Sequence, residues 1–327
     1  MADLMTYRDA VAEGLAREMR RDPAVVCLGE DIGAAGGVFK TTVGLLAEFG
    51  PDRVRDTPIS EQAITGMAMG AAMTGMRPVA EIMFSDFLAC CWDYLANEIP
   101  KMRYMTGGQV TVPLVIRTAN GGGLGFGAQH SQATENWAAA VPGLKVVAPA
   151  NPADVVGLLA SAVRCDDPVV FFEHKGLFAS RGEAPPAGDH VVPLGQAATV
   201  RPGTDITLVA LAATVPLAVA AAEELAASGA QAEVIDLRCL IPLDMATVLD
   251  SVRRTSRLLI VEENPYQGGW GGTVASIAAD EGFEFLDAPI RRVAAECVPL
   301  PFADALEDEV IPTTAKVVAA VRTLLDY

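Results

Sequence analysis

The feature that most constrains the fold is an alternation of short apolar runs with segments of helical spacing. In the N-terminal half, segments at 7–20, 87–104 and 152–164 have helical spacing, and strand-length apolar runs occupy 24–28, 78–83, 112–117, 144–148 and 168–173. Runs that are apolar throughout are typical of strands buried on both faces, and strands separated by helices usually pair in parallel. The pattern therefore predicts an α/β protein with a mostly parallel sheet covered by helices.

A change in composition divides the chain. Residues 180–204 carry four prolines among glycines, which is typical of a linker. The alternation then resumes, with helical segments at 215–227, 246–254 and 312–325 and strand-like runs at 205–211, 232–237 and 257–262. At 327 residues the chain is long enough for two domains. We place them at 1–190 and 200–327.

Charge and hydropathy exclude two classes of partner. The formal net charge of −17 argues against nucleic acid, whose binding proteins present basic surfaces. No membrane span is expected, because the most apolar stretch, 206–222, is broken by Thr and Pro. A chain that is 51% hydrophobic indicates surface buried against other subunits. The acidic balance fits either solubility or a face for a basic partner.

Cysteine spacing excludes the common cysteine-bound metals. None of the six cysteines forms a CxxC pair, so neither zinc nor an iron–sulfur cluster is indicated. The sequence MADLMTYRDA lacks a charged and then apolar leader. We therefore expect a reducing cytoplasm and unpaired thiols.

The segment 57–75, TPISEQAITGMAMGAAMTG, predicts an unusual helix. Thr57 can cap it, and Pro58 is tolerated in its first turn. Glycine within a helix costs about 1 kcal/mol relative to alanine, so a helix this rich in small residues indicates another backbone packed closely against it. Glu61 is the single acid of this element, and by itself it fits a solvated residue at the helix start equally well.

Long motifs along nearly the whole chain resemble the β subunits of thiamine-diphosphate-dependent 2-oxoacid dehydrogenases. The segments EIMFSDF, KMRYMTGG and AQHSQ are most similar to those of acetoin dehydrogenase β subunits. The motifs occupy 29–45, 56–87, 128–154, 167–178, 235–244 and 286–308. The resemblance implies a transketolase-like pyrimidine-binding domain at 1–190 and a transketolase C-terminal-like domain at 200–327.

The resemblance also implies a role for Glu61. In the family a carboxyl group hydrogen-bonds the aminopyrimidine of the cofactor and promotes loss of the thiazolium proton. Glu61 occupies that position, and Phe87 matches the aromatic residue that packs on the pyrimidine, although core packing is the ordinary role of a Phe. Ile59 and Met83 are expected to line the same pocket; some relatives carry Gln or Phe at the position of Met83.

His130, in AQHSQ, matches the family histidine that faces the reacting carbon and assists acyl transfer to lipoamide. It follows a glycine-rich stretch, 121–127, which we expect to be mobile and exposed. That stretch does not have the GxGxxG spacing of a dinucleotide-binding loop, so this alternative is rejected. The other histidines, His174 and His190, match no family position.

An absent motif implies a partner. Thiamine enzymes hold the diphosphate and Mg²⁺ with a GDG motif, and this sequence contains none. The resemblance therefore implies an α subunit that supplies those ligands, in an assembly of two α and two β chains that acts with a lipoyl acyltransferase core. The implied substrate is a 2-oxoacid or acetoin.

Two further sites are implied by the family. A K⁺ ion would be bound by backbone carbonyl groups, with an ordinary tight turn as the alternative. These groups belong to Leu114, Ala162, Val163, Cys165 and Asp167. Asp287 matches a position that pairs with the basic subunit-binding domain of the acyltransferase; the alternative is a solvated acid.

Two other functions stay open. The chain could be the β half of another transketolase-like enzyme, such as a split transketolase, or a docking subunit that has lost its chemistry. Retention of Glu61 and His130 argues against the second.

Overall fold

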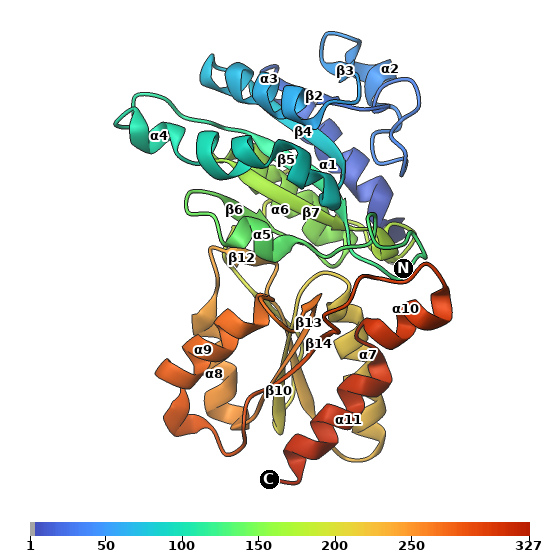
Figure 1. Cartoon of the computed structure of the whole chain (residues 1–327), viewed down its shortest axis with the longest axis vertical. Helices are drawn as coiled ribbons and strands as arrows, with labels where there is room; N and C mark the ends of the chain where they lie inside the picture. Colours follow the sequence, from blue (N-terminus) through green and yellow to red (C-terminus); the bar gives the residue numbers. More distant parts are fainter. Residues whose placement is uncertain (1–3) are drawn as a thin grey trace. The chain divides into compact units, whose positions relative to one another are not determined.

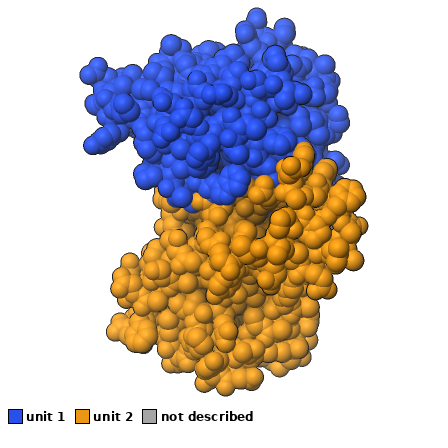
Figure 2. Space-filling model, viewed as in Figure 1, with its two compact units in different colours: residues 1–120, 137–194 blue, residues 121–136, 195–327 orange. Residues whose placement is uncertain are grey.

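The computed structural model describes residues 4–327, and the chain divides into two compact units (Figure 2). Unit 1 comprises residues 1–120 and 137–194, and unit 2 comprises residues 121–136 and 195–327. The sequence-based ranges, 1–190 and 200–327, are continuous, whereas unit 1 is interrupted by a segment that groups with unit 2.

Unit 1 is built on a parallel sheet. Its strands lie in the order β6-β7-β5-β4-β2-β3, and every pairing between these neighbours is parallel (Figure 1). The strands are β2 (Val25–Gly29), β3 (Val54–Asp56), β4 (Arg77–Phe84), β5 (Val115–Asn120), β6 (Lys145–Val147) and β7 (Val169–His174). The residues of β2, β5 and β7 are buried throughout, as expected for strands covered on both faces. The predicted fold class is confirmed.

Helices α1 (Tyr7–Arg21) and α6 (Pro152–Arg164) pack against each other. Each begins with a side-chain cap: Thr6 accepts the N–H of Asp9, and Asn151 accepts the N–H of Asp154. Further elements of this part of the chain are α2 (Leu45–Phe49), α3 (Glu61–Met73), α5 (Glu135–Ala139), η3 (Lys175–Leu177) and an antiparallel ribbon of β1 (Leu4–Thr6) with β8 (Arg181–Glu183).

The prediction of one continuous helix over 87–104 is wrong. The chain forms η1 (Ser85–Cys91), a π-type turn η2 (Tyr94–Glu98) and α4 (Met102–Met105) instead. Pro100 has no N–H to donate, so a continuous helical ladder cannot pass through it. The strand predicted at 112–117 begins only at Val115.

Unit 2 has a sheet in the order β14-β13-β10-β11-β9. Only the pairing of β9 (Ala198–Arg201) with β11 (Ala232–Asp236) is antiparallel; β10 (Ile206–Ala210), β13 (Leu258–Pro265) and β14 (Arg291–Ala295) complete the parallel part. Helices α7 and α11 pack together, as do α8 and α9, and the two pairs cover opposite faces of the sheet (Figure 1). Their bounds are α7 (Thr214–Ala227), α8 (Met245–Thr255), α9 (Gly271–Glu281) and α11 (Thr314–Leu325), and β12 (Cys239–Ile241), η4 (Phe283–Phe285) and α10 (Asp304–Val310) complete the unit.

None of the helices formed by residues 4–327 combines the length and the hydropathy needed to cross a bilayer.

Candidate active site

Glu61 opens helix α3 at the carboxyl ends of two strands. β3 ends at Asp56, and the N–H of Thr57 donates to the carbonyl of Gly29 at the end of β2 (2.9 Å). Ser60, not Thr57, is the N-cap residue, so the cap predicted from the sequence is wrong. The unpaired N–H groups of the first helical turn carry partial positive charge, which favours a carboxylate at this position. The side chain of Glu61 is half-buried.

A second acid, Glu30, follows directly after β2 and interacts with Glu61. Burial raises the pKa of the Glu30 carboxyl group, and the negative charges of Glu61, Asp31 and Glu81 raise it further. A carboxyl group with a raised pKa keeps its proton to a higher pH than an ordinary glutamate does. The sequence alone indicates no role for Glu30, although its place directly after a buried strand is a signal for one.

A buried ion triad lies in the sheet of unit 1. Arg117 on β5 donates through Nε and Nη2 to the carboxylate of Glu173 on β7 (2.6 and 2.8 Å) and through Nη1 to Glu81 on β4 (2.8 Å). Gly29 pairs with Glu81 in the ladder, and a Cβ at Gly29 would lie 3.0 Å from the Glu81 Cβ. The triad therefore fixes Glu81, one of the three acids whose charges raise the pKa of Glu30.

Apolar side chains belong to the elements that pack against helix α3. The ring of Phe87, in η1, meets Phe84 edge-on at 5.6 Å, and Met83 precedes Phe84 at the end of β4. Phe87 and Met83 are half-buried, and α3 packs against both β4 and η1. The charge of Glu61 raises the pKa of the Cys90 thiol beyond the effect of burial, so Glu61 lies next to η1. Ile59 is 82% exposed.

One face of α3 is open. Met67, Gly70 and Met73 are exposed along it, and a Cβ at Gly70 would meet nothing within 4 Å. Gly66 differs, because a Cβ there would lie 2.7 Å from the Tyr94 hydroxyl oxygen. The small residues of this helix predict another backbone packed against it. Gly66 is packed against a side chain of the same chain, not a backbone. Gly70 has no neighbour of either kind among the described residues.

His130 belongs to unit 2, in the segment 121–136, and its side chain is half-buried. Its N–H donates to the carbonyl of Gly127 (3.3 Å). The preceding stretch is exposed only in part: Gly123, Leu124 and Phe126 are exposed, as expected, whereas Gly121 and Gly122 are buried. The N–H of Gly122 donates to Glu263. Of the other histidines, His174 accepts the N–H of Gly176, and His190 contacts the carbonyl of Ala153.

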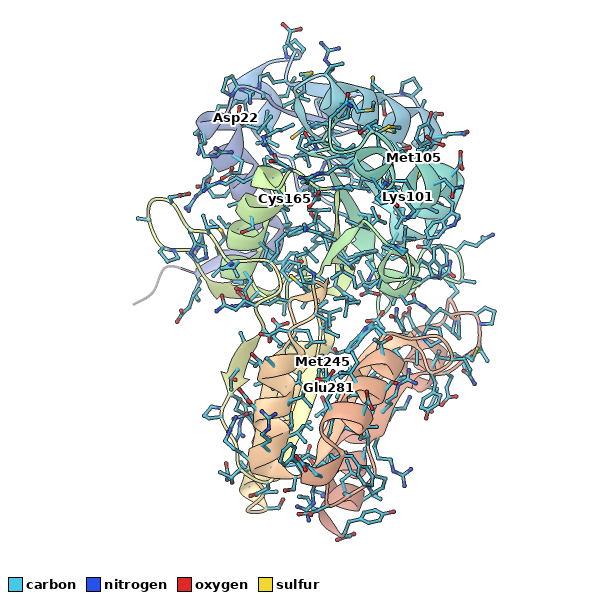
Figure 3. The ribbon with its side chains drawn as sticks, turned by 90° about the vertical axis from the view of Figure 1, so that its left-hand side faces the viewer. Asp22, Lys101, Met105, Cys165, Met245 and Glu281 are labelled. Carbon is cyan, nitrogen blue, oxygen red and sulfur yellow. The ribbon has the colours of Figure 1, made fainter. Side chains whose placement is uncertain are left out.

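The carbonyl groups expected to bind K⁺ lie around the end of α6, where Cys165 is labelled in Figure 3. Those of Val163 and Cys165 both accept from Arg77 Nη1 (3.0 and 3.1 Å). The carbonyls of Ala162 and Leu114 accept the N–H groups of Cys165 and Val169, and the Asp167 carboxylate pairs with Arg103 and Lys145. Within residues 4–327, no group of three or more His, Cys, Asp and Glu side chains could hold a metal ion.

Asp287 is exposed at the edge of a groove in unit 2. The groove has a volume of about 660 Å³, and its lining includes Phe283, Leu286 and the small residues Ala275 and Ala279 of α9. Phe283 is exposed despite its size. A mainly apolar lining that includes one acid suits a partner that presents a cation beside an apolar side chain.

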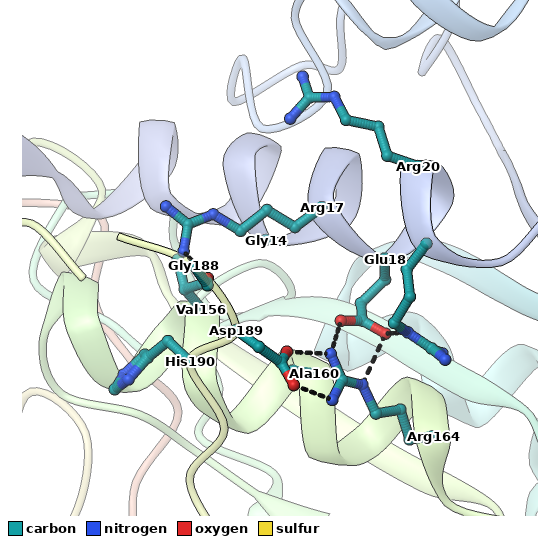
Figure 4. A pocket seen from close by; sticks show the side chains of 11 residues that line it. Gly14, Arg17, Glu18, Arg20, Val156, Ala160, Arg164, Gly188, Asp189 and His190 are labelled. Atoms are coloured by element: carbon teal, nitrogen blue, oxygen red, sulfur yellow. Dashed lines mark hydrogen bonds and ion pairs between the residues drawn. The ribbon is translucent and has the colours of Figure 1, made fainter. Parts of the chain in front are cut away.

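A further pocket, of about 500 Å³, lies beside α1 and α6 (Figure 4). Arginines dominate its lining, but each is paired with an acid: Arg17 with Glu13, Arg20 with Glu48, Arg21 with Glu18, and Arg164 with both Glu18 and Asp189. The pairing leaves no surplus positive charge for an anion, so this pocket is a structural ion-pair network.

Comparison with known families assigns both parts of the chain. Residues 3–180 match the transketolase pyrimidine-binding domain, and residues 195–317 match the transketolase C-terminal domain. A solved structure described as the inactive β4 tetramer of a split-gene transketolase is similar with a TM-score of 0.79 and 25% identity, covering 98% of both chains.

Curated relatives are similar over almost their whole length. The chain is 43% identical to the β subunit of acetoin:2,6-dichlorophenolindophenol oxidoreductase of Bacillus subtilis, covering 99% of this chain and 98% of the relative. It is 44% identical to the mitochondrial pyruvate dehydrogenase E1 subunit beta-1 of Arabidopsis thaliana, covering 97% and 88%. It is 42% identical to the 2-oxoisovalerate dehydrogenase β subunit of Bacillus subtilis, covering 99% of each.

Proposed function

Because the chain belongs to the transketolase-like family of β subunits of acetoin and 2-oxoacid dehydrogenases, we propose that it supplies the pyrimidine side of a thiamine diphosphate site completed by an α subunit. The reaction is decarboxylation of a 2-oxoacid, or cleavage of acetoin, with transfer of the acyl unit to a lipoyl group. The three similar relatives act on different substrates at 42–44% identity, so the identities do not choose between these substrates.

One observation carries the proposal: a half-buried carboxyl group beside a second acid with a raised pKa, next to an open apolar surface. When bound, the cofactor supplies a carbon nucleophile for the substrate carbonyl. Glu61 would hold a proton at its carboxyl oxygen against the far ring nitrogen of the aminopyrimidine. Glu30, whose pKa is raised by burial, would keep its own proton to a higher pH than an ordinary glutamate and would be the neighbouring proton donor.

The residues present fit the pyrimidine half of the cofactor. Phe87 offers an aromatic ring and Met83 a polarisable side chain beside α3, and Ile59, 82% exposed, would be covered by a bound ring or by a partner. His130 carries an imidazole that would assist acyl transfer to lipoamide. Because the sequence contains no GDG motif, the diphosphate and Mg²⁺ would be held by the α subunit.

Exposed apolar side chains support an obligate partner. Tyr104 and Met105, on α4, are 90% and 75% exposed, and Met105 is labelled in Figure 3. The open face of α3 adds Met67 and Met73, with Gly70 between them. Large exposed apolar side chains of this kind mark interaction surfaces. We assign them to the interface with the α chain, in an assembly of two α and two β subunits.

Asp287 and its groove would receive the subunit-binding domain of the lipoyl acyltransferase core. The net charge of −17 favours encounter with a basic partner, and the apolar groove supplies contact area. We place the assembly in the cytoplasm.

A K⁺ ion at the end of α6 is a separate proposal. The carbonyl oxygens of Val163 and Cys165 already accept from Arg77, and each keeps a second lone pair that K⁺ would use. K⁺ would then raise the melting temperature above that in tetramethylammonium at equal ionic strength. Equal melting temperatures would remove the ion from this site.

The decisive experiment replaces Glu61 with Gln in co-expressed α and β chains. Exchange of the thiazolium C2 proton with solvent deuterium, followed by NMR, should slow by about 10²-fold or more, because Gln cannot supply the carboxyl proton. Cofactor binding and assembly should persist. Glu223→Gln, on the exposed face of α7, is the matched control. Unchanged exchange in the Glu61 variant would remove Glu61 from the mechanism.

The similarity to a split-gene transketolase favours one alternative, a β half that acts on sugar phosphates. The assembled pair should be assayed with acetoin, pyruvate, branched 2-oxoacids and sugar-phosphate donors, with and without lipoamide. Turnover of sugar phosphates in the absence of lipoamide would favour the transketolase alternative. A chain that assembles but turns over none of these substrates would be a docking subunit.

A further inference from the structure

The glycine-rich loop, residues 121–127, is held by two acids from elsewhere in unit 2. The N–H of Gly122 donates to Glu263 Oε1 (2.6 Å), and the N–H of Gly125 donates to Glu307 Oε2 (2.9 Å). Glu307, on α10, is only 2% exposed. Hydrogen bonds to a carboxylate are stronger than neutral ones, and the low dielectric around a buried group strengthens them further.

The contact with α10 is close enough to favour glycine at two positions of the loop. A Cβ at Gly122 would lie 3.1 Å from Glu307 Oε1, and a Cβ at Gly125 would lie 2.9 Å from Asp304 Oδ1 and 3.1 Å from the carbonyl oxygen of Phe302. Gly125 also has a φ of +65°, which other residues rarely adopt. Gly122 and Gly125 therefore serve close packing on α10 and on the residues just before it, where the sequence suggested mobility.

The same loop is tied to the backbone around His130. The N–H of Gly121 donates to the carbonyl of Gln132 (3.1 Å), and the N–H of His130 donates to the carbonyl of Gly127 (3.3 Å). On the far side of His130, the buried Asn264 amide donates to the carbonyl of Ala133 (2.9 Å). The backbone around His130 is thus held on both sides: by the glycine-rich loop, which Glu307 binds, and by Ala133, which Asn264 binds.

We propose that Glu307 is a positioning residue for His130, acting through Gly125. The inference rests on the proposed function, in which His130 assists acyl transfer to lipoamide. Glu307 belongs to unit 2, whereas Glu61 and its neighbours belong to unit 1. Loss of Glu307 should therefore impair acyl transfer and leave proton removal from the cofactor intact.

The test uses Glu307→Ala and Glu307→Gln in the assembled α and β chains with thiamine diphosphate. Glu307→Ala should slow acylation of free lipoamide by about tenfold or more, because a small displacement of a catalytic group has a large kinetic effect. The rate of C2 proton exchange should stay within about twofold of wild type. Glu307→Gln keeps an acceptor oxygen and should restore most of the transfer rate. Glu309→Ala, exposed on the same helix, should change neither rate.

Equal loss of exchange and of transfer in Glu307→Ala would overturn the proposal, as would an unchanged transfer rate. His130→Ala separates this failure from that of the proposed function. If His130→Ala transfers acyl groups normally, the role of His130 is wrong and the positioning role falls with it. If His130→Ala is impaired while Glu307→Ala is not, only the positioning role is refuted.

Discussion

Replacing Arg117 with Met should destabilise unit 1 strongly. The guanidinium is 1% exposed and makes three hydrogen bonds, at 2.6, 2.8 and 2.8 Å, to two buried carboxylates. Removing one partner of a buried ion pair costs about 3–5 kcal/mol, because the remaining charge stays buried and uncompensated. Here Glu81 and Glu173 would both lose their cation, so we expect at least the upper part of that range.

The loss should depend on pH, and the sign follows from Glu173. Burial raises the pKa of Glu173 even though Arg117 lowers it, and removal of Arg117 removes the lowering effect. A carboxyl group with a raised pKa in the folded state binds its proton more tightly there than in the unfolded chain. Its contribution to stability is therefore present at low pH and is lost as the pH rises through the folded-state pKa. The variant should be closer to wild type at pH 5 than at pH 8.

Urea unfolding at both pH values, followed by circular dichroism, measures the effect. Arg55→Met is the matched control: Arg55 is exposed and its nearest acid oxygen, on Asp52, is 3.8 Å away, so the change should stay within about 0.5 kcal/mol. Combining Arg117→Met with Glu81→Gln and Glu173→Gln should recover part of the loss, because no buried charge then remains. A destabilisation below about 1 kcal/mol, or one equal at the two pH values, would refute the electrostatic account.

Three further substitutions test other parts of the molecule. Gly70→Leu should leave the isolated chain as stable as wild type or stabilise it by up to about 1 kcal/mol. The same variant should fail to assemble with the α chain in size-exclusion chromatography. Gly66→Leu, whose side chain would meet Tyr94, should instead destabilise the isolated chain itself. Asp287→Lys should slow association with the acyltransferase subunit-binding domain at low salt, and the difference from wild type should shrink as the salt concentration rises. Asp326→Lys, at another exposed acid, should not slow association. Equal association rates for Asp287→Lys and wild type would remove Asp287 from the interface. Arg164→Met should lower the free energy of unfolding by about 1–3 kcal/mol and expose the segment 184–190 to thermolysin, because Arg164 is bonded to both Glu18 and Asp189. Arg17→Met should lead to much less cleavage, because the Arg17 side chain contacts that segment only through backbone carbonyls at 3.3 Å.

Much of the fold could be predicted because the strand segments are mainly apolar and are separated by segments with helical spacing. The strands β2, β7 and β11 lie within a residue or so of their predicted positions. The region 85–105 could not be predicted in this way, since its composition suits a helix and only Pro100 interrupts it. The exchange of 121–136 into unit 2 depends on contacts with residues more than a hundred positions away, which local sequence patterns do not encode.

The candidate site divides in the same way. Glu61 and Phe87 could be proposed because long motifs match family positions, and α3 packs against η1 as the pairing of these residues requires. The raised pKa of Glu30 could not be predicted, because it depends on burial and on acids from separate segments. The hydrogen bonds of Arg77 to the carbonyls of Val163 and Cys165 at the end of α6 could not be predicted either, since arginine at the start of a strand has no distinctive spacing.

The attachment of 121–136 to residues near the C-terminus has a consequence for how the protein is made. Asn264 and Glu307 leave the ribosome long after His130, so the peptide around that histidine must wait without its final hydrogen-bond partners while the rest of the N-terminal sheet folds. A fragment ending at the linker would keep its sheet but carry this peptide unanchored, and adding the missing C-terminal fragment should restore it. Division of the gene at the linker would therefore give two pieces that need each other even before any α chain arrives.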